Sequence, residues 1–80
     1  MKFIFISTES VINADRIVSV TDVIDEAVCR QIVATTPAED LVDVSGEDRP
    51  RTAIYLHEGK VILSPLNTDK ILEQMTQDLE

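Results

Sequence analysis

Four side chains in one short segment have the chemistry to bind an anionic small molecule. Arg49 and Arg51 are followed by Tyr55 and His57, and the last three share one face if the segment is a strand. Guanidinium groups bind phosphate through paired hydrogen bonds, and an aromatic ring can stack on a nucleotide base. We predict a ligand-binding site here for a nucleotide-like anion, although no glycine-rich phosphate loop accompanies it. The alternative is that the arginines offset neighbouring acids while the ring covers the sheet.

Catalytic and metal-binding motifs are absent from the sequence. His57 is the sole histidine and Cys29 the sole cysteine, and neither has a partner at a useful spacing. We expect a surface histidine and a small buried thiol. The acidic pairs at 39–40 and 47–48 lack the order of an EF-hand. We therefore predict a protein that is no enzyme and has no metal or cofactor. The alternative, a small enzyme, would have to use His57.

The net charge of −8 is distributed unevenly along the chain. Residues 1–21 are neutral and residues 49–80 sum to −1. The segment between them has a single base, Arg30, against eight acids: Asp22, Asp25, Glu26, Glu39, Asp40, Asp43, Glu47 and Asp48. Without a basic cluster to displace counterions, nucleic acid is not an expected partner. The acidic segment suggests a second function, an inhibitor or adaptor that docks on a basic host-protein surface.

The sequence predicts a cytoplasmic protein. A lone cysteine cannot form an internal disulfide, which fits a reducing compartment. The apolar run at 3–6 is too short for a signal peptide or a membrane span, so we expect no membrane partner.

We expect one domain over residues 1–80, with an acidic loop excursion at about 36–50. Residues 36–48 should be mobile and removable, because they contain few apolar anchors. Residues 2–7 predict a strand that is apolar on both faces, and residues 17–20 predict a second. Residues 51–57 and 60–64 flank Glu58–Gly59 and predict a hairpin.

Two segments offer more than one interpretation. Residues 21–35 fit a helix, capped by Thr21 or Asp22, whose apolar face comprises Val23, Ile24, Ala27, Val28 and Ile32. The β-branched content of residues 28–35 instead favours a strand, which is our prediction. A C-terminal helix starts after Ser64 or after Asn67. Its apolar stripe, which should pack on the face of Ile54 and Leu56, is Ile71, Leu72, Met75 and Leu79.

These elements predict an α+β fold, a small antiparallel β-sheet (a meander) with one C-terminal amphipathic helix packed on one face. One helix covers only one face, yet the strands are apolar on both. We therefore predict a homo-oligomer whose partner subunit covers the second face. Pockets between subunits would then hold the ligand.

The order of features resembles short bacterial and phage proteins built as a β-meander followed by one helix, and small flagellar proteins of the FlbD type look similar. The matching residues are Phe3, Ile4, Ile12, Asn13, Ile17, Val20, Ile54, Tyr55, Leu56, Gly59, Val61, Ile62, Leu63, Ser64 and Ile71. The resemblance implies the fold and no catalytic residues. It also implies only a short turn before the strand of Ile54, where this chain has about thirty residues. By analogy with phage-encoded proteins that sequester nucleotide signals, we predict a non-enzymatic binding protein.

Overall fold

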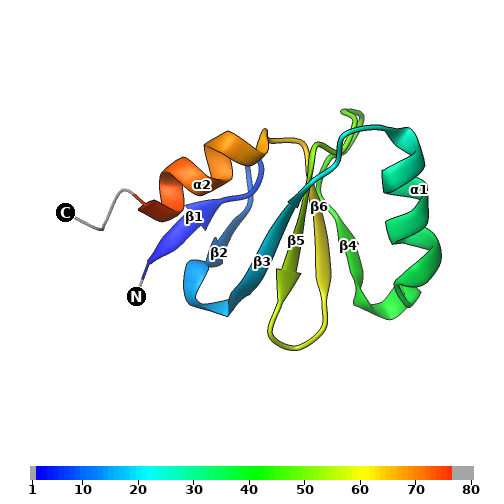
Figure 1. Cartoon of the computed structure of the whole chain (residues 1–80). Helices are drawn as coiled ribbons and strands as arrows, with labels where there is room; N and C mark the ends of the chain where they lie inside the picture. The colour runs from blue at the N-terminus through cyan, green and yellow to red at the C-terminus, as the bar shows by residue number, and fades with distance from the viewer. Residues whose placement is uncertain (1, 77–80) are drawn as a thin grey trace.

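A four-stranded sheet lies at the centre of the molecule, with a separate two-stranded hairpin beside it (Figure 1). These features belong to a computed structural model, which describes residues 2–76. The strands are β1 (Phe3–Phe5), β2 (Val11–Asn13), β3 (Ile17–Asp22), β4 (Leu41–Asp43), β5 (Thr52–Leu56) and β6 (Val61–Ser64), and the α-helices are α1 (Glu26–Thr35) and α2 (Thr68–Thr76). Short 3-10 helices span Ala14–Arg16 and Ala38–Asp40. The predicted α+β class is confirmed.

The central sheet is mixed rather than a pure antiparallel meander. Its strand order is β3-β5-β6-β4. β5 pairs antiparallel with both β3 and β6, whereas β4 pairs parallel with β6. β1 and β2 form their own antiparallel pair, so the first strand is not the central strand that its two apolar faces suggested.

The β5–β6 hairpin forms where the sequence predicted it. Gly59 in its turn has a φ of 87°, a left-handed conformation that favours glycine. Because side chains alternate along a strand, Ile54 and Ile62 point to one face while Ala53 and Leu63 point to the other. All four are buried, so both faces of this hairpin need a cover.

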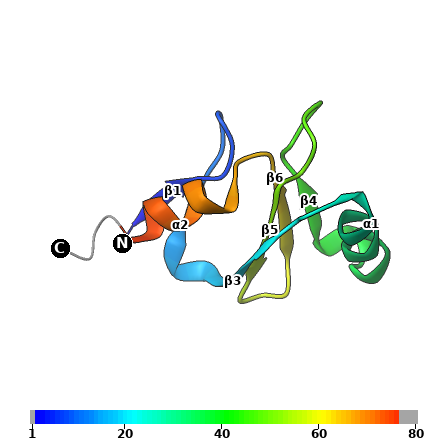
Figure 2. The same cartoon turned by 45° about the horizontal axis from the view of Figure 1, so that its top comes forward.

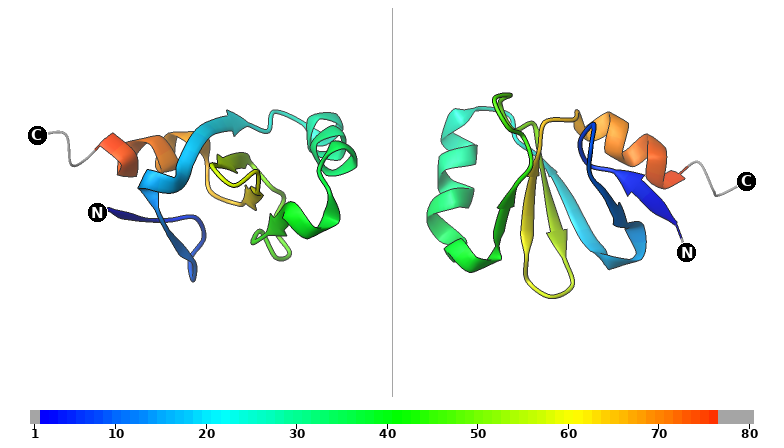
Figure 3. Two further views of the ribbon diagram at one scale, coloured as in Figure 1. Left: turned by 90° about the horizontal axis from the view of Figure 1, so that it is seen from below. Right: turned by 180° about the vertical axis from the view of Figure 1, so that it is seen from behind.

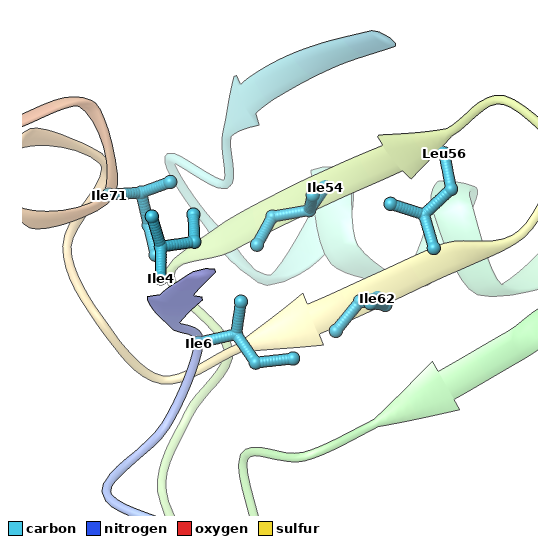
Figure 4. Packing of buried hydrophobic residues seen from close by; sticks show 6 residues of the cluster. All are labelled: Ile4, Ile6, Ile54, Leu56, Ile62 and Ile71. Atoms are coloured by element: carbon cyan, nitrogen blue, oxygen red, sulfur yellow. The ribbon is translucent and has the colours of Figure 1, made fainter. Parts of the chain in front are cut away.

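The first face is covered by α2 and the β1–β2 hairpin. Figure 4 shows the buried cluster between them: Ile4, Ile6, Ile54, Leu56, Ile62 and Ile71. The Ser64 hydroxyl also donates a hydrogen bond to the Ile6 carbonyl, which ties the N-terminal hairpin to β6. The predicted packing of the C-terminal helix on this face is confirmed for Ile71 and Met75, whereas Leu72 of the predicted stripe is 43% exposed. Leu79, the last residue of the predicted stripe, lies outside the described residues.

The segment 28–35 is helical, so our prediction of a strand there is wrong. The helix α1 begins after Asp25, whose Oδ1 accepts a hydrogen bond of 3.0 Å from the N–H of Val28. It ends before Pro37, with the Thr36 hydroxyl donating to the carbonyl of Ile32 at 2.7 Å. The cap and the burial of one apolar face outweigh the β preference of the branched residues.

α1 covers the second face of the sheet. The cluster beneath it is Val23, Ile32, Ala53, Val61 and Leu63, with Val28, Cys29, Leu41 and Tyr55 packed at its margin. In the left view of Figure 3, α1 and the β1–β2 hairpin lie on opposite sides of the central sheet, and Figure 2 shows α1 and α2 at opposite ends. The face that we reserved for a partner subunit is therefore covered from within the chain.

Part of the acidic segment belongs to the central sheet. Leu41 pairs with Val61 in the parallel β4–β6 register, and the N–H of Val44 donates to the Leu63 carbonyl at 3.0 Å. Ser45 beyond them is buried. β4 has only three residues and lies between acidic pairs, so its hydrophobic pattern is too short to predict a strand from the sequence. Removing residues 36–48 would take β4 away and expose an edge of β6, so the expectation that this segment is dispensable does not fit the arrangement.

We predict that Ile32→Ala lowers the free energy of unfolding by about 2–4 kcal/mol, because it leaves a cavity under α1. Its neighbour Val33 is 44% exposed against 8% for Ile32, so Val33→Ala on the same helix should cost under about 1 kcal/mol. Urea unfolding of both variants measures the difference. Equal losses would contradict the packing of α1 on the sheet.

Candidate anion-binding site

The backbone of Arg51 is fixed where three strands of the central sheet meet. Its N–H donates to the Ser64 carbonyl at 2.8 Å, and its carbonyl accepts from the N–H of Val23 at 3.0 Å. Arg51 thus bridges the end of β6 and the residue after β3. Its side chain is exposed, and Nη1 donates to Oδ1 of Asn67 at 3.0 Å. A rigid backbone therefore presents a guanidinium group to solvent.

A chain of hydroxyl groups fixes the start of α2 beside Arg51. The fully buried Thr52 donates from its hydroxyl to the Leu66 carbonyl at 2.8 Å and lies 3.0 Å from the Thr68 hydroxyl. Thr68 in turn donates to Oδ1 of Asp22 at 2.9 Å, which links α2 to the end of β3. α2 begins at the second predicted start, because the Asn67 carbonyl accepts the first helical hydrogen bonds. The network holds Asn67 and the first turn of α2 next to Arg51.

Two hollows flank the Arg51 side chain. The first, of about 390 Å³, is lined by Asp22, Val23, Ile24, Arg49, Pro50, Arg51 and Asn67. The second, of about 340 Å³, is lined by Asp48, Arg49, Arg51, Pro65, Leu66, Asn67 and Lys70. Both volumes suit part of a small ligand. The first hollow has an apolar portion, and the second concentrates positive charge.

We call Arg49, Arg51 and Lys70 the cationic corner. Within residues 2–76 the ion pair joins Arg16 to Glu58, and none of the three cations of the corner takes part in an ion pair. Asp48 lines the second hollow with them, but no salt bridge forms there. The chain has 15 acids that could pair with these cations. The absence of such pairs within residues 2–76 leaves the three cations available to an anionic ligand.

The structure brings together only part of the predicted site. Arg49 and Arg51 line the same hollows. Tyr55 lies in β5, four residues after Arg51, which is a distance of about 13 Å along an extended strand. It packs at the margin of the cluster under α1. His57 lies beyond the end of β5, exposed, with its N–H donating to the Arg16 carbonyl at 2.9 Å. A shared strand face does not make distant residues one site.

Lys70 and Asn67 also line the candidate site, although we did not predict them from the sequence. The sequence contains one indication of Lys70. A cation in the first turn of a helix lies at the positive end of the helix dipole, which is unfavourable unless an anion is nearby. Lys70 stands at that position, and no acid within residues 2–76 forms a salt bridge with it. Its proximity to Arg51 depends on the long-range packing of α2, which the sequence alone does not give.

The other candidates of the sequence analysis lie apart from the corner. Cys29 is a free, partly buried thiol on α1, packed against the second cluster. In the part of the chain that the structure describes, no group of three or more histidine, cysteine or acidic residues is arranged to hold a metal ion. No helix within residues 2–76 has the length and apolar character to cross a membrane.

Comparison with protein families finds one match that spans nearly the whole chain. The model of the RemA-like family, described as "Extracellular matrix regulatory protein A-like", matches residues 3–75. A comparison with curated proteins finds no significant match. The likeness to FlbD-type proteins remains a prediction from the sequence.

We predict that Thr68→Val destabilises the protein by about 1–2 kcal/mol, because Asp22 loses its hydroxyl donor and the buried Thr52 hydroxyl is left beside a methyl group. The isosteric control is Thr76→Val on the same helix, where the exposed hydroxyl donates only to the Glu73 carbonyl. Thermal unfolding of both variants compares them. If the two losses are alike, the hydroxyl network does not anchor α2.

Proposed function

The chain belongs to the RemA-like family, and we propose that it acts as a non-enzymatic regulatory protein of the cytoplasm that binds a small nucleotide-like anion. The family description names a regulatory protein, which supports regulation rather than catalysis as the role of this chain. We place the ligand at the cationic corner, without a metal or cofactor. We also propose that the protein works as a homo-oligomer.

The observation that carries the ligand proposal is the uncommitted cationic corner beside two hollows. Phosphate oxygens would accept hydrogen bonds from Arg49 and Arg51, with Lys70 adding a third positive charge. The neighbouring hollow offers Val23, Ile24 and Pro50 to a flat, less polar moiety such as a base. Asn67 already orients the Arg51 guanidinium, so little side-chain order is lost on binding. Tyr55 and His57 have no role in this arrangement.

Nucleic acid is a poorer candidate for the corner than a small anion. The corner has three cations, and the segment 22–48 beside it sums to −7. A duplex that follows a protein surface would meet that negative charge, whereas a small anion needs only the corner itself.

We predict that adenosine 5′-diphosphate binds the wild type and that Arg51→Ala weakens it by about tenfold or more. A charge-assisted hydrogen bond from arginine to phosphate contributes about 1.5–3 kcal/mol, and the exposed side chain adds little to stability. Isothermal titration calorimetry gives both affinities. The matched control is Lys60→Ala, which removes a cation next to the β5–β6 turn and should leave the affinity unchanged.

Three further titrations separate the parts of this proposal. Pyrophosphate should bind more weakly than the nucleotide, adenosine should not bind, and raised salt should weaken both anions. Equal affinities for wild type and Arg51→Ala would contradict the site. Tighter binding of a short duplex DNA than of the nucleotide would contradict the ligand class.

A second function is favoured by the acidic segment. Its acids lie at the end of β3, at the start of α1, on the following 3-10 helix, on β4 and in the loop before Arg49, and Glu39, Asp43 and Glu47 are exposed. Such a surface would suit an inhibitor or adaptor that docks on a basic protein. Under that function Arg51→Ala would leave the regulatory effect intact, and Glu39→Lys with Asp43→Lys would abolish it.

A further inference from the structure

The β1–β2 hairpin exposes large apolar side chains on its outer face. Phe3 is 60% exposed, Phe5 55% and Val11 51%. The inner face of the same hairpin is buried, with Ile4 in the first cluster and Ile12 packed against it. The hairpin is therefore apolar on both faces, but only its inner face packs against another part of the chain.

The three exposed side chains form one continuous patch, which we call the aromatic patch. Phe5 and Val11 stand directly opposite in the antiparallel register, and Phe3 lies two residues along the same strand. Residues at i and i+2, and residues opposite each other, share a face. With about 200 Å² for a phenylalanine side chain, the patch exposes about 300 Å² of apolar surface. That is less than half of the roughly 800 Å² that each partner buries in a standard interface, so the patch would form the apolar centre of a larger contact.

The backbone at the free edge of β1 is already occupied. The side-chain amide of Gln74 in α2 accepts from the N–H of Phe5 at 2.8 Å and donates to its carbonyl at 2.9 Å. A partner strand therefore cannot add to β1 at Phe5. The side-chain face of β1 remains available. The two hydrogen bonds from Gln74 fix the backbone of Phe5, which lowers the entropy cost of using Phe5 as an anchor residue.

Charge decides which partner suits the patch. From Phe3 to Asn13 the sole charged residue is Glu9, and residues 1–21 are neutral overall. The excess of −7 lies in residues 22–48. α1 itself balances Glu26 with Arg30, and the other acids lie in the segments around it, including the 3-10 helix Ala38–Asp40 and β4, toward the end of the molecule opposite β1 and α2 (Figure 2). Two copies that meet through their β1–β2 hairpins would keep their acidic ends apart.

We infer that the aromatic patch binds the same patch of a second copy of this chain, in a two-fold symmetric contact. This inference rests on the homo-oligomer proposed above and assigns its interface. In a two-fold contact each patch faces itself, so a residue near the axis meets its own copy. The face under α1, where the sequence placed the partner, has no part in it.

The first test uses sedimentation equilibrium of the wild type and of Phe3→Thr with Phe5→Thr, which keeps the β propensity of the strand. The self-dissociation constant should rise at least tenfold, because two aromatic anchors are lost. The isosteric control is Val42→Thr on β4, where an exposed apolar residue lies in the acidic segment and should not matter. Circular dichroism melts confirm that the variants are folded.

The second test uses charge reversal and does not depend on the double variant. Val11→Glu and Val11→Lys should each be monomeric, because like charges would face each other at the patch. Mixing the two variants should restore a dimer, which only folded proteins with this interface can form.

The outcomes separate the two claims. A monomeric wild type at high concentration overturns the homo-oligomer and the interface with it. A wild-type oligomer that Phe3→Thr with Phe5→Thr leaves unchanged, or that Val42→Thr disrupts, overturns the interface alone and leaves the proposed oligomer standing. A mixture of the Val11 variants that stays monomeric also overturns the two-fold contact.

Discussion

The β5–β6 hairpin is buried on both of its faces, and the rest of the structure follows from this constraint. Ile54 and Ile62 on one side and Ala53 and Leu63 on the other are almost fully removed from water. An 80-residue chain must then supply two covers from its own length. It uses α2 with the β1–β2 hairpin for one face and α1 for the other, so little of the chain remains uncommitted.

The candidate site lies where α2 connects to the β5–β6 hairpin. The chain leaves β6 and enters α2 beside the start of β5, and the hydroxyl groups of Thr52 and Thr68 fix that junction. Arg51, Asn67 and Lys70 therefore lie together although they come from different elements. The N-terminal hairpin covers the core with one face only, which leaves its phenylalanines on the outer surface. One architecture thus produces both a cationic corner and an aromatic patch.

The sequence predicted the elements that have a strong local pattern. The alternation around Glu58–Gly59 predicts the hairpin, and the apolar stripe beginning at Ile71 predicts α2 and the face that it covers. It failed at 28–35, where the cap on Asp25 and the packing of Ile32 outweigh β-branched composition. Strand β4 depends on parallel pairing with a distant strand, which local patterns cannot reveal. The two arginines were found from residue type, whereas Lys70 joins them only through tertiary packing.

Nuclear magnetic resonance can show whether the cationic corner binds a nucleotide. A titration of ¹⁵N-labelled protein with adenosine 5′-diphosphate follows every backbone amide at once. If the corner binds it, we expect chemical-shift changes at Arg49, Arg51 and residues 66–70, with the turn at Glu58–Gly59 unchanged. Shifts centred on that turn or on α1, or no shifts at millimolar nucleotide, would contradict binding at the corner.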